Sequence, residues 1–283
     1  MELWLILAIL AFTSYATSIS IDKYLMSHKY GILRTNTLKM FFDGAILLII
    51  GLLFFDLNFS SNVLFWSIPL GIIYSLAGIV YFTALKLKDV EQVIPTWQSL
   101  GILLLFIFSI IIFNEFVTLF NYLGVALILV GVYMILSKTG FQMPVLDKGF
   151  CIILAVVFLD VTYALLVKYL VSSISPITLA IMMYFVATLV LVVYNFSFNK
   201  KVKIIDSTSK TLKILVAAFF GAMGTLLIYS ALSIGNASKI YPISGLQCVF
   251  IFIIASIFLK EKFYLHRLAG TIAVVFGIFL VSI

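Results

Sequence analysis

Apolar runs of about twenty residues recur along the whole chain and restrict its fold more than any other feature. A hydrocarbon core of about 30 Å needs about 20 residues of helix to cross it. The runs are continuous and do not alternate with a period of two, which favours helices over strands. The sequence therefore predicts an all-α integral membrane protein with ten spans: Leu3–Ile21, Thr35–Phe55, Val63–Leu85, Val93–Phe113, Phe116–Leu136, Gly149–Val167, Pro176–Phe196, Leu212–Ile234, Ile240–Leu259 and Tyr264–Ser282.

The composition agrees with this class. Hydrophobic residues make up 64% of the 283 positions and charged residues only 10%, and the mean hydropathy is +1.25. A soluble domain carries about 25% charged residues, so most of this surface is not suited to water.

The basic residues are unevenly distributed among the connections. Sixteen of the 18 Lys and Arg residues lie in or beside the odd-numbered connections, and only Lys168 and Lys239 lie in the even ones. Because basic loops stay in the cytoplasm, we expect a multi-pass protein of the plasma membrane with both termini outside. The net charge of +7 is explained in the same way, and we expect no nucleic-acid partner.

Several short motifs occur twice, in the same order and 145 to 147 residues apart. The divisions 1–137 and 147–283 are thus predicted to be homologous five-helix repeats. Because five is an odd number of spans, the repeats should be inserted in opposite orientations, with a substrate site between them near the midplane. The matched motifs are Lys23-Tyr24-Leu25 with Lys168-Tyr169-Leu170, Ala84-Leu85 with Ala231-Leu232, Pro95 with Pro242, and Glu115, Gly124 and Gly131 with Glu261, Gly270 and Gly277.

These motifs resemble those of the drug/metabolite transporter superfamily, and specifically of its ten-helix EamA-like members. The resemblance covers essentially the whole chain. It implies export or uptake of amino acids, sugars, nucleobases or cationic compounds through a central cavity. Family members commonly have both termini in the cytoplasm, so the orientation expected from the basic loops departs from the family pattern.

A second, shorter resemblance concerns the sixth predicted span. Asp160 lies eight positions before Lys168-Tyr169, which looks like the first helix of small multidrug resistance transporters. There an acidic residue binds protons and cationic drugs in turn. At an offset of 145 residues the other repeat has Tyr15 in place of this acid.

Asp160 is the first candidate for a functional group. It lies near the middle of its span, where a carboxylate is costly and is therefore expected to bind something or to be paired. Tyr163, one turn away, could donate a hydrogen bond to it or offer its ring to a cation. The alternative is an Asp160 that only fixes helix packing. The full set predicted to bind substrate or protons is Asp160, Tyr163, Tyr15, Trp97, Gln98, Tyr81, Tyr229, Tyr241 and Gln247.

Lys39 and Asp43 form a second group of candidates. Their i, i+4 spacing favours an ion pair within one helix, although such a pair could also line a cavity. Glu115 and Glu261 begin their spans and are interpreted as helix caps. The Gly124/Gly131 and Gly270/Gly277 pairs are interpreted as packing surfaces between the halves or between subunits.

We therefore predict a secondary carrier for a small amino-bearing or cationic metabolite, such as an amino acid, an amine or a drug-like cation. We expect it to be coupled to protons and to act as a monomer or homodimer in the lipid bilayer. An uncoupled facilitator or exchanger for neutral metabolites such as sugars or nucleobases is the alternative. A membrane enzyme would need clustered catalytic side chains, and a non-transporting subunit would be expected to have a large loop or tail. We expect neither, and we expect no cofactor and no metal.

Overall fold

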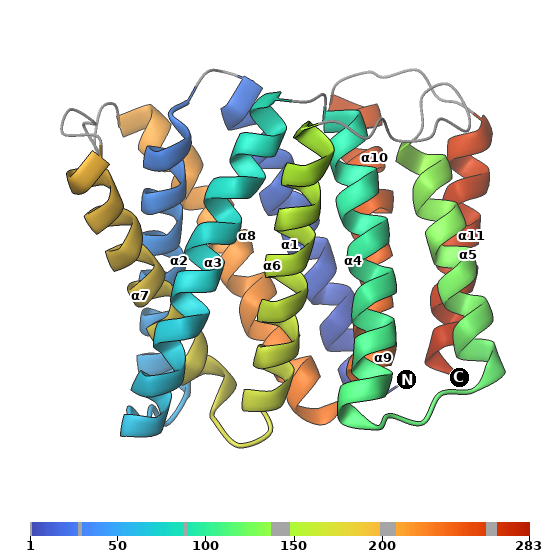
Figure 1. The fold of residues 1–283 in the computed structure, drawn as a ribbon, viewed down its shortest axis with the longest axis horizontal. Coiled ribbons are helices and arrows are strands. Elements are labelled where there is room, and N and C mark those ends of the chain that lie inside the picture. Colours follow the sequence, from blue (N-terminus) through green and yellow to red (C-terminus); the bar gives the residue numbers. More distant parts are fainter. Residues whose placement is uncertain (1, 28–29, 88–89, 137–147, 199–207, 259–264) are drawn as a thin grey trace.

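The computed structural model describes residues 2–283 except 28–29, 88–89, 137–147, 199–207 and 259–264 (Figure 1). The described residues form helices and no strand. The helices are α1 (Leu3–Ser27), α2 (Ile32–Phe54), α3 (Ser61–Leu87), α4 (Val90–Phe113), α5 (Leu119–Leu136), α6 (Lys148–Leu170), α7 (Pro176–Phe198), α8 (Thr208–Ile234), α9 (Ala237–Ile240), the 3-10 helix η1 (Tyr241–Ser244), α10 (Gly245–Phe258) and α11 (Leu265–Ser282).

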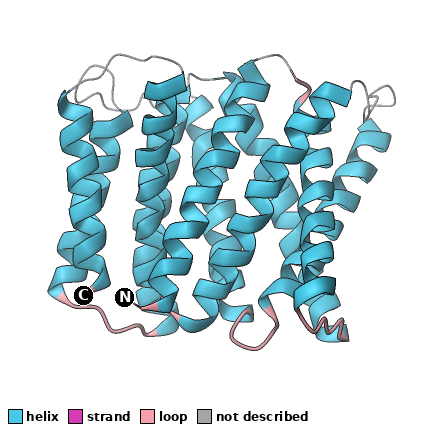
Figure 2. Ribbon diagram, turned by 180° about the vertical axis from the view of Figure 1, so that it is seen from behind, coloured by secondary structure: helices cyan, strands magenta, loops and turns pink. Residues whose placement is uncertain are grey.

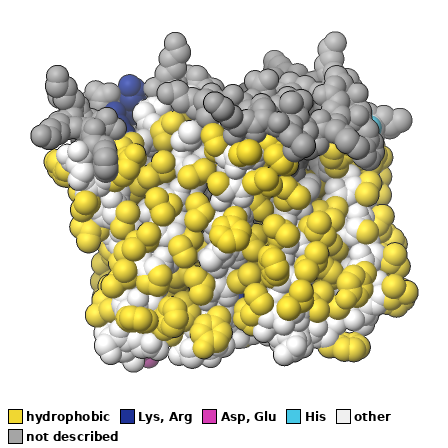
Figure 3. All heavy atoms as spheres, in the orientation of Figure 1, with side chains coloured by type: hydrophobic (Ala, Val, Ile, Leu, Met, Phe, Trp, Pro, Cys, Tyr) yellow, Lys and Arg dark blue, Asp and Glu magenta, His cyan; other side chains and the backbone are white. Residues whose placement is uncertain are grey.

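The helices stand side by side in one bundle, and both termini lie at the same end of it (Figures 1 and 2). Hydrophobic side chains cover most of the described surface in the view of Figure 3. Exposed large apolar residues include Leu52, Phe54 and Phe158. Among the described residues, α1, α2, α3, α6, α7 and α8 contain segments long and apolar enough to cross a membrane. Lipid is the solvent that such a surface suits.

The most extensive helix contact among the described residues joins α5 to α11. A Cβ atom added at Gly131 would lie 2.6 Å from the carbonyl oxygen of Gly270, and one at Gly124 would lie 2.6 Å from that of Gly277. The backbones therefore touch, as small residues at this spacing allow. This confirms the interpretation of the two glycine pairs as packing surfaces and places the contact between the two halves of the chain.

The ninth predicted span, Ile240–Leu259, is not one continuous helix. It is built from the end of α9, the 3-10 turn η1 and α10. Pro242 lies in η1, and proline cannot donate the backbone hydrogen bond that an α-helix requires there. Pro95, the matching proline, lies within α4, which runs without interruption from Val90 to Phe113.

Glu115 caps a helix, although not its own as we had expected. Its two carboxylate oxygens accept hydrogen bonds from the backbone N–H groups of Ala237 (2.8 Å) and Ser238 (2.7 Å) at the start of α9. Residues 114–118 precede α5 and are not helical, and Asn114 has a positive φ of 49°. Glu115 thus fastens the connection before α5 to the interrupted helix, and Glu261 lies outside the described residues.

Candidate functional site

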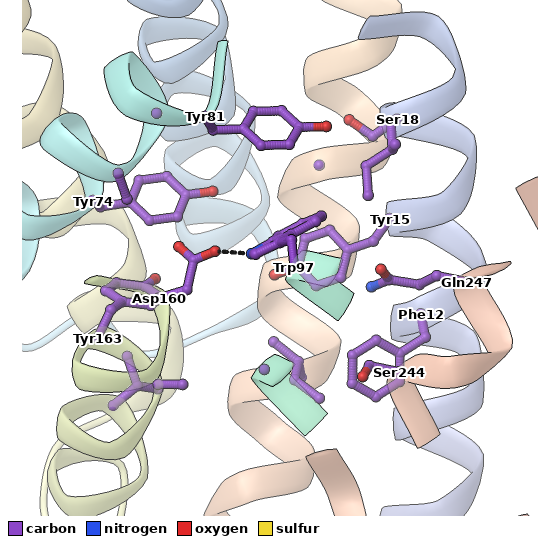
Figure 4. Close-up of a pocket in the computed structure, with 18 of the residues that line it drawn as sticks. Phe12, Tyr15, Ser18, Tyr74, Tyr81, Trp97, Asp160, Tyr163, Ser244 and Gln247 are labelled. Carbon is purple, nitrogen blue, oxygen red and sulfur yellow. Dashed lines mark hydrogen bonds between the residues drawn. The ribbon is translucent and has the colours of Figure 1, made fainter. Parts of the chain in front are cut away.

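A cavity of about 300 Å³ lies in the centre of the bundle (Figure 4). Side chains from α1, α2, α3, α4, α6, α8, η1 and α10 line it, together with Tyr184 of α7. All eleven predicted site residues are among its lining: Tyr15, Lys39, Asp43, Tyr81, Trp97, Gln98, Asp160, Tyr163, Tyr229, Tyr241 and Gln247. The structure therefore brings together residues that the sequence scatters over both halves.

Asp160 is held by Trp97 of the neighbouring helix α4. The indole Nε1 of Trp97 in α4 donates a hydrogen bond of 2.6 Å to a carboxylate oxygen of Asp160 in α6 (Figure 4). The ring of Tyr81 lies 5.2 Å from that of Trp97, measured between centroids. The acid is thus oriented by an indole and bordered by aromatic rings, a setting that suits a cation.

We expected Tyr163 to donate a hydrogen bond to Asp160 or to offer its ring to a cation, but its hydroxyl group has a different partner. It forms a hydrogen bond with the hydroxyl group of Tyr229, and its ring lies 4.9 Å from the ring of Tyr74. Thr225 joins two further tyrosines, with oxygen distances of 2.9 Å to Tyr15 and 2.6 Å to Tyr184. These tyrosines form a hydroxyl-bonded aromatic wall.

The interrupted helix contributes the remaining polar groups. Gln98 donates a hydrogen bond of 2.9 Å from Nε2 to the carbonyl oxygen of Ser244 in η1, and Tyr241 donates one of 2.5 Å to the carbonyl oxygen of Ala164. Gln247, one turn further along, is buried and lines the cavity. Helix interruptions of this kind are tolerated at membrane depth where they line a cavity.

The ion pair that we expected between Lys39 and Asp43 within α2 is wrong, because Lys39 has a different partner. Lys39 forms its salt bridge with Asp22 of α1, across the cavity wall. Asp43 lies against Gly221 of α8, where an added Cβ atom would be 2.8 Å from its Oδ1. Oδ1 of Asp43 has no hydrogen-bond partner among the described residues. The cavity therefore contains a second acidic region besides Asp160.

Family models of the EamA-like transporter family match residues 2–137 and 147–283. The chain belongs to the EamA-like transporter family. Its two family repeats cover nearly the whole sequence, and together with the apolar helices they make this a multi-pass membrane protein of a family that transports small molecules. This is a family of transporters.

Two individual proteins resemble this EamA-like chain. An uncharacterized protein of Methanocaldococcus jannaschii is 33% identical over 69 residues, which are 24% of this chain and 50% of that protein. The chain thus matches about half the length of this relative. A solved crystal structure is 16% identical and aligns over 98% of both chains with a TM-score of 0.79. At this identity the likeness concerns the fold alone.

Several lining residues of this EamA-like cavity had not been predicted. Asp22 was not among the predicted site residues; the first predicted span ends at Ile21, whereas α1 continues to Ser27. Asp22 lies seven residues after Tyr15, so helical spacing already placed them on one face. The other residues that sequence analysis left out of the site include Phe12, Ser18, Asn36, Tyr74, Tyr184 and Ser244.

Proposed function

We propose that this EamA-like protein is a secondary transporter that moves a small amino-bearing or cationic metabolite across the plasma membrane in exchange for protons. The observation that supports this most is the position of Asp160, which lines the cavity among aromatic rings and is oriented by Trp97. A carboxylate at membrane depth is stabilised by a cation or by a proton. Substrate and proton would therefore compete for the same group.

The charges around the cavity favour a cationic substrate over an anionic one. Its ionisable lining residues include Asp22, Asp43 and Asp160, but Lys39 is the one basic residue among them in the described part of the chain. Lys39 is already paired with Asp22. An anion would meet uncompensated carboxylates, whereas an ammonium group would meet an acid and aromatic faces.

We further propose that ten spans cross the membrane as two inverted repeats, 1–137 and 147–283, with both termini outside. Related helix pairs support this symmetry: α1 packs against α8 as α3 packs against α6, and α10 packs against α1 as α4 packs against α6. The glycine contacts between α5 and α11 have the same symmetry, because Gly124 and Gly277 contact each other, as do Gly131 and Gly270. Since a single chain surrounds the cavity, we expect a monomer to suffice.

Uptake into proteoliposomes tests this function. Wild type, Asp160→Asn and Asp56→Asn would be compared on labelled amino acids, amines, sugars and nucleobases, with and without an imposed pH gradient. Asp56 is exposed and outside the cavity, so Asp56→Asn controls for the loss of one carboxylate. We expect amine uptake that the gradient drives and that only Asp160→Asn abolishes.

Two other results would reject parts of the proposal. Gradient-independent uptake of a neutral compound by all three proteins would identify an uncoupled facilitator and leave Asp160 a packing residue. No uptake of any class of compound, by protein shown to be folded, would argue against a transporter of these metabolites.

A further inference from the structure

The region around Asp43 has features of a binding position that the proposed function does not use. Asp43 is 1% exposed, lines the cavity, and has a carboxylate oxygen without a hydrogen-bond partner among the described residues. A buried carboxylate with an unused acceptor is costly unless something occupies it.

A second buried polar side chain lines the same part of the cavity. Asn36 lies on α2 two turns before Asp43 and is 1% exposed. Neither amide atom of Asn36 has a hydrogen-bond partner in the described part of the chain. Its amide packs against Gly78 of α3, where an added Cβ atom would be 2.7 Å from Nδ2. Because buried amides are nearly always satisfied, these atoms point to a polar ligand or water in the cavity.

The charges in the cavity do not balance. The Asp, Glu, Lys, Arg and His residues that line it, in the described part of the chain, are Asp22, Lys39, Asp43 and Asp160. Lys39 forms its salt bridge with Asp22. Asp43 and Asp160 therefore remain as two carboxylates without a salt-bridge partner among the described residues, and low-dielectric surroundings favour their neutralisation by two positive charges.

Aromatic rings line the cavity together with Asp43 and Asp160. The ring of Tyr81 packs against that of Trp97, which donates the hydrogen bond to Asp160. The ring of Tyr74 packs against that of Tyr163, one turn from Asp160, and against that of Tyr184, which lies against Gly44, the residue after Asp43. Figure 4 shows Tyr74 and Tyr81 directed into the space beside Asp160. Such a wall suits an apolar chain with a cation at each end.

Resting on the proposed function, we propose that Asp43 is a second cation-binding position and that the substrate is an aliphatic diamine. One ammonium group binds Asp160 and the other binds Asp43, with the methylene chain along Tyr74 and Tyr81. The cavity of about 300 Å³ is at the small end of ligand pockets, as a short diamine requires.

Binding to reconstituted protein tests the proposal, with straight-chain diamines compared with monoamines of equal length. Wild type should bind the best diamine about tenfold or more tightly than its monoamine, as expected for one added charged hydrogen bond. Asp43→Asn should weaken diamine binding more than monoamine binding and so remove this preference, while Asp160→Asn should weaken both. Asp56→Asn should behave as wild type.

A charge-conserving variant guards against loss of the fold. Asp43→Glu keeps the carboxylate but extends it by one methylene group, so the preferred diamine should become shorter by about one methylene group. A preference that keeps the same chain length, or equal weakening of monoamine and diamine in Asp43→Asn, would overturn the proposal.

Exchange of Na⁺ for K⁺ in the assay distinguishes an inorganic ion from the second ammonium group. Monoamine binding that requires Na⁺, and loses this requirement in Asp43→Asn, would assign the position to a metal cation and overturn the diamine. If monoamines bind and diamines have no advantage, this inference fails alone. If no amine binds to folded protein, the proposed function fails with it.

Discussion

Glycines contact different kinds of atoms in two regions of the bundle, the α5–α11 contact and the central cavity. In the first, Gly124, Gly131, Gly270 and Gly277 bring two backbones together, with each missing Cβ replaced by a carbonyl oxygen of the other helix. In the second, Gly78 and Gly221 line the cavity and face the ends of side chains, namely those of Asn36 and Asp43.

This difference separates a fixed contact from a binding region. Backbone against backbone leaves no group that could move without separating the helices, so the α5–α11 contact suits a permanent junction between the halves. Glycine against a polar side chain leaves a group that can turn toward a ligand. Helical glycine spacing alone does not distinguish the two cases, but the chemistry opposite the glycine does.

The largest effect should come from filling the α5–α11 contact. In Gly131→Leu the new side chain would meet the backbone of Gly270. A helix backbone cannot move aside in the way that the end of a flexible side chain can. We expect loss of folded, monodisperse protein in detergent, measured by size-exclusion chromatography and thermal unfolding. Val130→Leu is the matched control, since Val130 is half exposed on the outer face. A stable Gly131→Leu protein would show that the junction is adjustable.

Removal of Lys39 should have the next largest effect. Lys39→Met leaves Asp22 without its salt-bridge partner, and breaking a buried pair from one side typically costs about 3–5 kcal/mol. Lys39→Met with Asp22→Leu should recover part of this loss, because it also removes the carboxylate that the first substitution leaves unpaired. Thermal unfolding of the single and double variants would measure the difference. Equal stability of Lys39→Met and wild type would mean that the pair contributes little.

The sequence predicted which residues line the cavity better than it predicted how they are bonded. Apolar runs and doubled motifs are local signals, and they located the helices and the glycine contact. The Lys39–Asp22 pair depends on how α1 and α2 are each rotated about their own axes, and the spacing of residues within α2 carries no information about that. The interruption at Tyr241–Ser244 has only Pro242 as its signal, and the matching Pro95 leaves α4 continuous.

A smaller effect is expected from Gly221→Ala, the counterpart in the cavity of Gly131→Leu. The added methyl group would lie 2.8 Å from Oδ1 of Asp43, so the carboxylate must turn aside. Overpacking of this kind costs about 1–3 kcal/mol, and a movable side chain favours the low end. We expect a modest fall in thermal stability and a clear fall in diamine preference. Loss of stability as large as that of Gly131→Leu would remove the distinction between the two regions.

The smallest effect should follow Tyr163→Phe, which removes the hydrogen bond to Tyr229. Net hydrogen bonds contribute about 1 kcal/mol, and the polar cavity can supply water to the hydroxyl group that remains. The free energy of unfolding should therefore fall by about 1 kcal/mol. Uptake should fall only to the extent that the aromatic rings around Tyr163 become less well packed. Tyr184→Phe offers the contrast, since Tyr184 is 1% exposed and bonded to Thr225. Water should replace that bond less readily, so Tyr184→Phe should lower the free energy of unfolding more than Tyr163→Phe. The reverse order would show that water reaches the part of the cavity near α7 more easily than the part near Tyr163.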